Sequence, residues 1–479
     1  MIGAALAIGA ALAVDLEVAP GDDIRTLTES LGPGDRVVFG DGVYVLESEL
    51  YWTFAGTESD PVVIKAAAGA EPIIELAPGD DGDYPSQILN VSGASWLRVE
   101  GLHFRGSGPS ALADEGDGHH GITLSGTVGV SLIDVEVDTT TYNLLNITGD
   151  NSALTIERAH LHDNENGRAL WAGCSDGSCW LADSLISNCW IHGIRGNDGG
   201  IYLSDGSQGV TIEHTVLHDI DAQGIRIGET YGGTANTVSG NAIWNVMNQG
   251  IEARGAARIH NNLIFDVDGD GLHSSDNTGV LDDQVISFNT ILDTTEWAVE
   301  IREWWAYEGL VFANNALCNP VGLGLFYGDH EADTGALGTT NLITGNVACG
   351  YIDSLGLPDS GVAAGGGFYD YLDVEGWNLY PAQGSALVDA ADPSGDTWIP
   401  DTDFNGAPRE GDAPDVGAYE WSGADNPGWQ VREGFKELGY EREPQAEQVG
   451  GCCSDDASGT QALIWLPWLA LGAGWRRRG

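Results

Sequence analysis

The chain has 479 residues, of which 69 are glycine, 2 are methionine and 19 are lysine or arginine. This composition favours tight turns and strands over long helices, so it argues against a mainly helical protein. The formal net charge of −53 at pH 7 repels nucleic acid phosphates and anionic lipids, which excludes nucleic acid as a partner. A polyanionic substrate is also disfavoured unless cations or a local basic patch intervene.

The first residues have the features of a secretory signal. Residues 1–13 are apolar and small, and they end in Ala11-Leu12-Ala13, which fits an apolar core followed by a cleavage site. The basic residues that usually open such a signal are missing, so a true start further upstream and a buried strand are the alternatives. We expect an exported protein whose mature chain begins near Val14.

The last residues, 451–479, resemble the C-terminal sorting tails of myxobacterial surface proteins. They contain Gly451-Cys452-Cys453, a polar spacer, an apolar segment from Ala462 to Trp475, and Arg476–Arg478. The apolar segment is shorter than the roughly 20 residues that cross a bilayer as a helix. A transient membrane stop with processing at the cysteine pair is therefore favoured over a short permanent membrane helix. The resemblance implies an extracellular, cell-surface-anchored protein that meets the membrane only through this tail.

A short phrase of apolar, variable and apolar residues recurs from residue 89 onward. Steps of 21 to 33 residues separate its first apolar residues, which are Leu89, Ile122, Leu145, Leu170, Ile201, Ile225, Ile251, Leu272 and Val299. Repeats of this length that alternate strands and turns are typical of a solenoid of stacked coils. The pattern predicts an all-β fold, a parallel β-helix with loops of variable length.

A second series of apolar anchors supports the same coils: Ile156, Leu181, Ile212, Val238, Ile259, Ile286, Phe312 and Ile343. Three residues beyond the last five anchors stand Asn241, Asn262, Asn289, Asn315 and Asn346. Stacked asparagines can hydrogen-bond from coil to coil, which predicts a turn ladder. Seven residues beyond the anchors stand Asp163, Asn188, Asp219, Asn245, Asp266, Asp293 and Asn319. We interpret these as turn-closing residues rather than catalytic acids.

The start of the chain carries the motifs of a known family. Asp22–Leu31 places Ile24, Leu27 and Leu31 on one helical face, which predicts a short N-terminal capping helix. Gly34–Val38, Asp41–Tyr44, Gly56–Ile64 and Leu97–Phe104 then resemble the opening of pectate-lyase-like β-helix proteins. The resemblance implies a right-handed parallel β-helix over residues 20–365 and a polysaccharide as partner.

A further segment resembles a C-terminal region found behind bacterial β-helices that carry surface anchors. It runs from Leu387-Val388-Asp389-Ala390 through Asp403, Gly406 and Arg409 to Asp415–Glu420. The resemblance implies a capping region over residues 366–421 that covers the last coil. Its Asp, Arg and Glu residues could form a site, but we favour a structural, salt-bridged closure. Residues 422–450 follow as an acidic linker. We expect a monomer.

Five cysteines precede the tail: Cys174, Cys179, Cys189, Cys318 and Cys349. In an exported protein they are disulfide candidates, and one of them is left over. Cys318 and Cys349 both stand six residues past their anchors in neighbouring coils. Adjacent strands lie about 4.8 Å apart, so the sequence predicts a disulfide between these two.

The candidate catalytic and substrate-binding residues stand at outward-facing positions of the first repeat strand. Period-two alternation points the neighbours of the apolar residues outward. The candidate catalytic residues Glu252, Arg254, His273 and Glu300 stand there. Candidate substrate-binding residues accompany them on the same face: Trp171, Tyr202, Arg226, Arg302 and Trp304. Four neighbouring coils supply the charged members, so the site needs no metal or cofactor to hold it together.

Four interpretations of this face remain open. In a lyase, Arg226 and Arg302 would neutralise a uronate carboxylate while Arg254 or His273 removes the ring proton; the lysine common in the pectate-lyase-like family has no counterpart here. In a hydrolase, Glu252 and Glu300 would act as acid and base, about 9.6 Å apart at the backbone. A glycan-binding groove without turnover and a structural charge ladder are the other two.

Aromatic and acidic residues complete the candidate features. Trp171, Tyr202, Trp304 and Trp305 border the face and suit stacking on sugar rings, or alternatively packing beneath loops. Asp266–Gly271 has the D-x-D-x-D-G start of a calcium loop, but Asn277 stands where that loop needs its late glutamate. Calcium is therefore only a secondary expectation.

Overall fold

The computed structural model describes residues 13–77, 86–106, 119–196, 199–276, 280–281, 283–328, 340–353, 361–395, 397–409 and 413–437. The described residues belong to one compact unit. The sorting tail, most of the signal segment and much of the acidic linker lie outside the described residues. In the part of the chain that the structure describes, no helix is long and apolar enough to cross a membrane.

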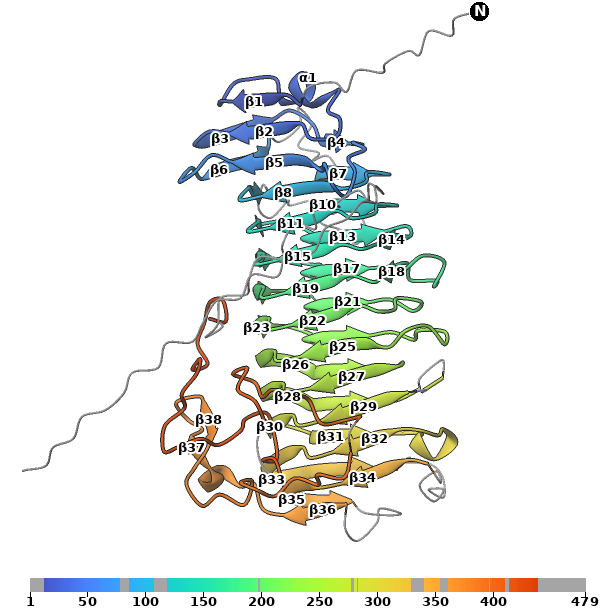
Figure 1. Cartoon of the computed structure of the whole chain (residues 1–479), viewed down its shortest axis with the longest axis vertical. Coiled ribbons are helices and arrows are strands. Elements are labelled where there is room, and N and C mark those ends of the chain that lie inside the picture. The colour runs from blue at the N-terminus through green and yellow to red at the C-terminus, as the bar shows by residue number, and fades with distance from the viewer. Residues whose placement is uncertain are drawn as a thin grey trace, which may run out of the picture. The chain divides into compact units, whose positions relative to one another are not determined.

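The described strands stack into a long parallel solenoid with three faces, which we call ladders A, B and C (Figure 1). Ladder A is a sheet of its own, while ladders B and C belong to one sheet because four long strands run through both: β26 (Ala242–Ala253), β28 (Leu263–Ser274), β33 (Ala316–Tyr327) and β35 (Asn346–Asp353). Each coil contributes one strand to each ladder, so residues about 25 positions apart become neighbours.

Ladder A contains β1 (Asp15–Val18), β2 (Arg36–Phe39), β5 (Val62–Ala66), β8 (Leu97–Glu100), β11 (Ser131–Ile133), β15 (Thr155–Glu157), β19 (Leu185–Ser187), β22 (Thr211–Glu213), β25 (Asn236–Ser239), β27 (Ala257–His260), β29 (Gln284–Ser287), β32 (Val311–Ala313) and β34 (Leu342–Thr344). Ladder B contains, besides the first halves of β26, β28, β33 and β35, the strands β3 (Gly42–Leu46), β6 (Pro72–Leu76), β9 (His103–Arg105), β12 (Glu136–Asp138), β16 (His160–Asn164), β20 (Trp190–Ile194), β23 (Val216–Ile220), β30 (Thr290–Thr294) and β36 (Val362–Ala364). Ladder C contains, besides the second halves of those long strands, β4 (Leu50–Trp52), β7 (Gln87–Ser92), β10 (His120–Ser125), β13 (Leu145–Thr148), β17 (Leu170–Ala172), β21 (Ile201–Leu203), β24 (Ile225–Ile227) and β31 (Trp297–Ile301). The remaining elements are α1 (Ile24–Thr28), η1 (Trp304–Ala306), η2 (Phe368–Asp370) and the short pairs β14 (Asn151–Ser152) with β18 (Leu181–Ala182) and β37 (Tyr371–Asp373) with β38 (Asn378–Pro381).

The first repeat series stacks in ladder C in the register that the sequence predicts. Leu89 pairs with Ile122, which pairs with Leu145, and the pairing continues residue by residue to Val299. All nine residues are at most 1 % exposed. Their side chains form the interior of the coils, and their neighbours in sequence therefore point outward, as the alternation requires.

The second series is correct except at Leu181. Ile156 pairs with Ile186, and Ile186 pairs with Ile212, so Ile186 is the anchor of its coil. Leu181 lies in β18, an additional strand that pairs with β14. This coil contains the loop closed by the disulfide between Cys174 and Cys179, which delays the anchor by five residues. Gly193 consequently takes the turn position that the spacing assigns to Asn188.

The asparagine ladder is confirmed at the turn between ladders A and B. Asn241 Nδ2 donates to Asn262 Oδ1 at 3.0 Å, and the same bond recurs from Asn262 to Asn289, from Asn289 to Asn315 and from Asn315 to Asn346. Each of the five side chains also bonds backbone groups of the coil before it. The turn is therefore satisfied by buried side chains along five coils.

Helix α1 covers the first end of the stack, as predicted, and begins after Asp23, whose side chain accepts from the amide of Thr26. Cys318 and Cys349 form the predicted disulfide, Cys174 pairs with Cys179, and Cys189 is a buried free thiol. The Cys174–Cys179 disulfide closes a loop within one coil, whereas the Cys318–Cys349 disulfide joins paired strands of neighbouring coils.

The C-terminal region packs along the side of the solenoid. It forms an apolar cluster with the outer side of ladder B, which includes Val216, Trp244, Phe265 and Leu292. Figure 1 shows this region, in orange and red, alongside the lower coils. It thus covers the flank of the solenoid as well as meeting the last coils. Arg409, buried here, bonds Glu420 and several backbone carbonyls, which fits the expected salt-bridged closure.

Candidate functional site

Outward positions of ladder C bring all the predicted charged residues onto one face. Arg226 in β24 pairs with Glu252 in β26, which pairs with His273 in β28, which pairs with Glu300 in β31. Arg254 and Arg302 follow two residues after Glu252 and Glu300. The strand ladder holds these side chains because each is fixed by the inward packing of its two neighbours.

Two buried glutamates divide the face into two clusters, and the first is centred on Glu252. Its Oε1 accepts from Arg254 Nε at 2.8 Å, and its Oε2 lies 3.3 Å from Arg226 Nε. The glutamate side chain is only 6 % exposed, and the two arginines are 17 % and 19 % exposed. The alternation in the sequence predicts an outward direction but not this depth. Two guanidinium groups therefore compensate the burial of one carboxylate.

The second cluster is centred on Glu300, which is 4 % exposed. Glu300 Oε2 lies 2.6 Å from His273 Nδ1, and its Oε1 accepts from Arg302 Nη2 at 2.6 Å. Asp270 also approaches His273, at 3.3 Å, and accepts from the backbone amide of Trp297. The sequence does not assign Asp270 to the site, because period-two alternation puts residues three apart in a strand on opposite faces. The two residues meet because β28 passes from ladder B to ladder C between them.

The second cluster has a fixed protonation pattern. Burial alone lowers the pKa of His273, but Asp270 and Glu300 outweigh it and raise that pKa to about 9. Burial raises the pKa of Glu300, but hydrogen bonds from His273 and Arg302 outweigh it and lower that pKa to about 2. Burial also raises the pKa of Asp270. At neutral pH His273 is a cation, so it is not poised to act as a general base. Glu300 is an anion, so it is not poised to act as a general acid.

Trp171 and Tyr202 lie side by side at one end of the face. Their rings stack at 4.7 Å between centroids, because they are partners in neighbouring strands. The guanidinium of Arg168 lies over both rings, and that of Arg226 lies 4.3 Å from the Tyr202 centroid. The rings thus position two arginines as well as bordering the face.

Trp304 does not border the face, and the prediction of a sugar-stacking role for it is wrong. Its side chain is fully buried, and its Nε1 donates to Ser274 Oγ at 2.8 Å. Trp304 opens the short helix η1, which turns the ring back into the coil instead of outward. Trp305, the next residue, is half-buried. The sequence does not distinguish the two because the turn at Glu303, in left-handed backbone conformation, decides which ring points inward.

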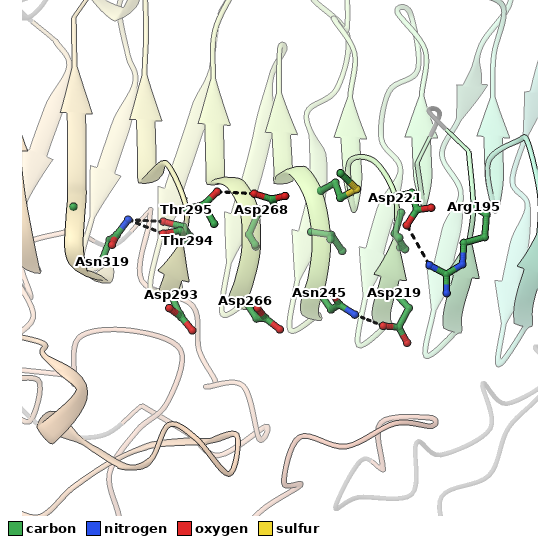
Figure 2. A pocket seen from close by; sticks show the side chains of 15 residues that line it. Arg195, Asp219, Asp221, Asn245, Asp266, Asp268, Asp293, Thr294, Thr295 and Asn319 are labelled. Atoms are coloured by element: carbon green, nitrogen blue, oxygen red, sulfur yellow. Dashed lines mark hydrogen bonds and ion pairs between the residues drawn. The ribbon is translucent and has the colours of Figure 1, made fainter.

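A groove of about 590 Å³ lies beside this face, at the turn from ladder B to ladder C (Figure 2). Five aspartates and one arginine line it: Asp219, Asp221, Asp266, Asp268, Asp293 and Arg195. Asp219, Asn245, Asp266 and Asp293 adopt left-handed backbone conformations, which fits the predicted turn-closing role. Burial and the neighbouring Asp293 and Asp219 raise the pKa of Asp266. The groove is therefore acidic, in contrast to the adjoining arginine face.

Asp266–Gly271 does not form a calcium loop. The whole segment belongs to strand β28, so alternate aspartates lie along one extended chain instead of converging on a centre. Asp266 and Asp268 line the groove, while Asp270 contacts His273. Calcium binding by the aspartates of this segment stays a prediction.

Comparisons with known proteins agree with this architecture. A family model described as a right-handed beta helix region matches residues 87–264. The crystal structure of pectate lyase Pel9A aligns with a TM-score of 0.52 and 13 % identity over 86 % of this chain and 98 % of that one. The fold is a right-handed parallel β-helix of the pectate-lyase type. The A-module of the Azotobacter vinelandii mannuronan C-5 epimerase AlgE6 aligns with a TM-score of 0.47 and 14 % identity, over 70 % of this chain and 90 % of that one. No curated protein matches the sequence.

Proposed function

We propose that this right-handed β-helix binds an acidic polysaccharide along ladder C and does not cleave it at neutral pH. The observation that carries the proposal is the row of guanidinium groups from Arg168 through Arg226 and Arg254 to Arg302 on a strongly acidic protein. Guanidinium groups bind carboxylates and sulfates with paired hydrogen bonds, which makes an acid-bearing glycan the best match.

Parts of this row are available to a ligand. The Arg302 side chain is 36 % exposed, so its guanidinium group can meet a ligand while it stays paired with Glu300. Arg254 and Arg302 stand two coils apart in one column, about 9.6 Å by strand spacing. A chain with carboxylates at regular intervals suits such a column.

The protonation pattern favours binding over turnover. Glu300, whose pKa is lowered to about 2, is unsuited to be the acid of a hydrolase. His273, whose pKa is raised to about 9, is unsuited to be the base of a lyase at neutral pH. The alternative is a structural or adhesive surface solenoid in which the ion pairs only join neighbouring coils.

A panel of polysaccharides separates these functions. Alginate, polygalacturonate, a sulfated glycan and a neutral glucan are immobilised for retention, and each is also incubated with the protein while unsaturated uronate absorbance and new reducing ends are measured. We expect retention on an acidic glycan with neither absorbance nor reducing ends. Absorbance would instead show a lyase, reducing ends alone a hydrolase, and no retention on any of the four would support the structural solenoid.

We further propose that the protein is exported and held at the cell surface by residues 451–479. The two disulfides among the described residues support export, because such bonds persist in oxidising compartments. Mass spectrometry of the mature protein is expected to find a chain that begins near Val14 and lacks Arg476–Arg478. An intact arginine tail on the mature protein would contradict the sorting proposal.

A further inference from the structure

Outward positions of ladder B gather histidines and carboxylates on consecutive coils. Two positions in each strand face outward, and they carry His103 and Arg105 in β9, Glu136 and Asp138 in β12, His160 and His162 in β16, and Trp190 and His192 in β20. Strand pairing places Glu136 beside His160, Asp138 beside His162, and His162 beside His192. This cluster lies on a different ladder from the arginine face.

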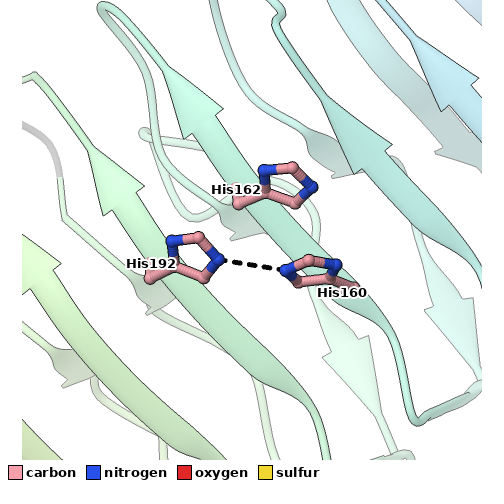
Figure 3. A group of neighbouring side chains, drawn as sticks. All are labelled: His160, His162 and His192. Carbon is pink, nitrogen blue, oxygen red and sulfur yellow. Dashed lines mark hydrogen bonds between the residues drawn. The ribbon is translucent and has the colours of Figure 1, made fainter. Parts of the chain in front are cut away.

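The nitrogen atoms of three of these histidines converge. His160 Nε2 lies 3.0 Å from His192 Nε2, and one nitrogen from each of His160, His162 and His192 lies within 4.8 Å of the other two (Figure 3). Glu136 Oε1 adds an oxygen 3.2 Å from His162 Nε2. Two metal–nitrogen bonds of about 2.0–2.1 Å at near-tetrahedral or square angles place their nitrogens about 3 Å apart, as here.

Neighbouring groups orient and support these ligand atoms. His162 Nδ1 lies 2.9 Å from Asp163 Oδ2, and this contact to a carboxylate directs Nε2 toward the centre of the cluster. His103 Nε2 lies 3.0 Å from Asp138 Oδ2, which adds a second histidine and carboxylate at the edge.

Ring stacking alone does not account for this arrangement. The same column continues as His218, Trp244 and Phe265, whose rings stack without any convergence of ligand atoms. In the cluster, by contrast, two imidazole nitrogens face each other at 3.0 Å, where at most one proton can lie between them. Without a metal, one proton shared in a single hydrogen bond satisfies the two nitrogens. A bound cation would instead accept the lone pairs of both nitrogens.

We propose that His160, His162 and His192, together with Glu136, form a binding site for a divalent late transition-metal ion of the Zn²⁺ class. Imidazole-rich donor sets select Zn²⁺ and Cu²⁺ over Ca²⁺ and Mg²⁺, which prefer oxygen ligands. The ion would link three consecutive coils, β12, β16 and β20, next to Phe435 of the C-terminal region, whose ring contacts those of His160 and Trp190. The site is independent of polysaccharide binding on ladder C.

The test is a Zn²⁺ titration by calorimetry in excess Mg²⁺, which occupies the many surface carboxylates. The protein is first stripped with a chelator, and the double variant H160Q/H192Q is compared with H120Q, a half-buried histidine on ladder C. We expect one tight equivalent in the wild type and in H120Q, and at least a tenfold weaker affinity in the double variant. Equal affinity in all three proteins, or no tight equivalent in the wild type, would overturn the proposal.

A second measurement keeps the proposal testable if the double variant folds poorly. Cu²⁺ bound to the wild-type protein is expected to show nitrogen superhyperfine structure in its electron paramagnetic resonance spectrum, which reports imidazole ligands directly. E136Q is expected to retain this nitrogen pattern but to bind Zn²⁺ more weakly than the wild type. A Cu²⁺ spectrum with oxygen ligands only would refute the histidine site.

Discussion

Replacing Asn289 by alanine is expected to lower the free energy of unfolding by about 3–5 kcal/mol, because several buried backbone and side-chain groups would lose their partners at about 1–3 kcal/mol each. Asn289 Nδ2 donates to Ile259 O and Asn315 Oδ1, and its Oδ1 accepts from the backbone and side-chain amides of Asn262. The residue is fully buried at the centre of the asparagine ladder. Denaturant unfolding of wild type and variant measures the change.

The exposed Asn166 provides the matched control for this substitution. N166A is expected to change the free energy of unfolding by no more than about 0.5 kcal/mol, as is usual for an exposed side chain. Similar losses in N289A and N166A would show that the ladder adds nothing beyond ordinary asparagine contacts.

The His273–Glu300 cluster is expected to give stability a strong pH dependence. The pKa of His273 rises from 6.5 to about 9 on folding, so its contribution is complete below pH 6.5 and disappears as the pH rises through 9. The pKa of Glu300 falls from 4.5 to about 2, so its contribution is complete above pH 4.5 and disappears as the pH falls through 2. The cluster therefore stabilises the fold most between pH 4.5 and 6.5.

The size of the alkaline change follows from the shift of His273, which corresponds to about 3 kcal/mol at 1.36 kcal/mol per pKa unit. Unfolding of the wild type and of H273Q is measured at pH 6 and pH 9.5. We expect the wild type to lose about 3 kcal/mol more than H273Q between these values. H162Q, which changes a histidine on ladder B, serves as the comparison and should keep the His273 contribution. Parallel pH profiles for wild type and H273Q would contradict the assigned ion pair.

The coil register was the most predictable feature of the sequence. The residues of the series from Leu89 to Val299 are the inward residues of one ladder. Within each strand every second residue is buried, so the strands can be aligned whatever the length of the loops between them. The asparagine ladder was predictable for the same reason, since each asparagine occupies one turn at a fixed distance from an apolar anchor. Leu181 was misplaced because an additional strand and a disulfide loop precede the true anchor, Ile186.

The candidate site was predictable in its location but not in its pairing or depth. The alternation brought Arg226, Glu252, His273 and Glu300 to one face, and the structure adds the contacts that fix their charges. Trp304 was misplaced because a local helix turns its ring inward. The histidine cluster on ladder B was missed. Glu136 and Asp138, and likewise His160 and His162, stand two residues apart, which is the spacing of outward positions in a strand. Attention to the second face of each coil would have revealed it.

The most direct test of polysaccharide recognition compares a uronan retained in the panel, alginate or polygalacturonate, with the same polymer after its carboxyl groups have been methyl-esterified. R302Q removes the most exposed guanidinium beside Glu252 and Glu300, and R105Q removes an arginine of equal exposure, 36 %, that pairs with Glu75 on ladder B. We predict that the wild type and R105Q bind the acid form alone, and that R302Q binds it roughly tenfold or more weakly, as expected for a charged hydrogen bond of about 1.5–3 kcal/mol. Equal binding of the ester, or equal affinity of R302Q and R105Q for the acid, would contradict recognition by the arginine row of ladder C.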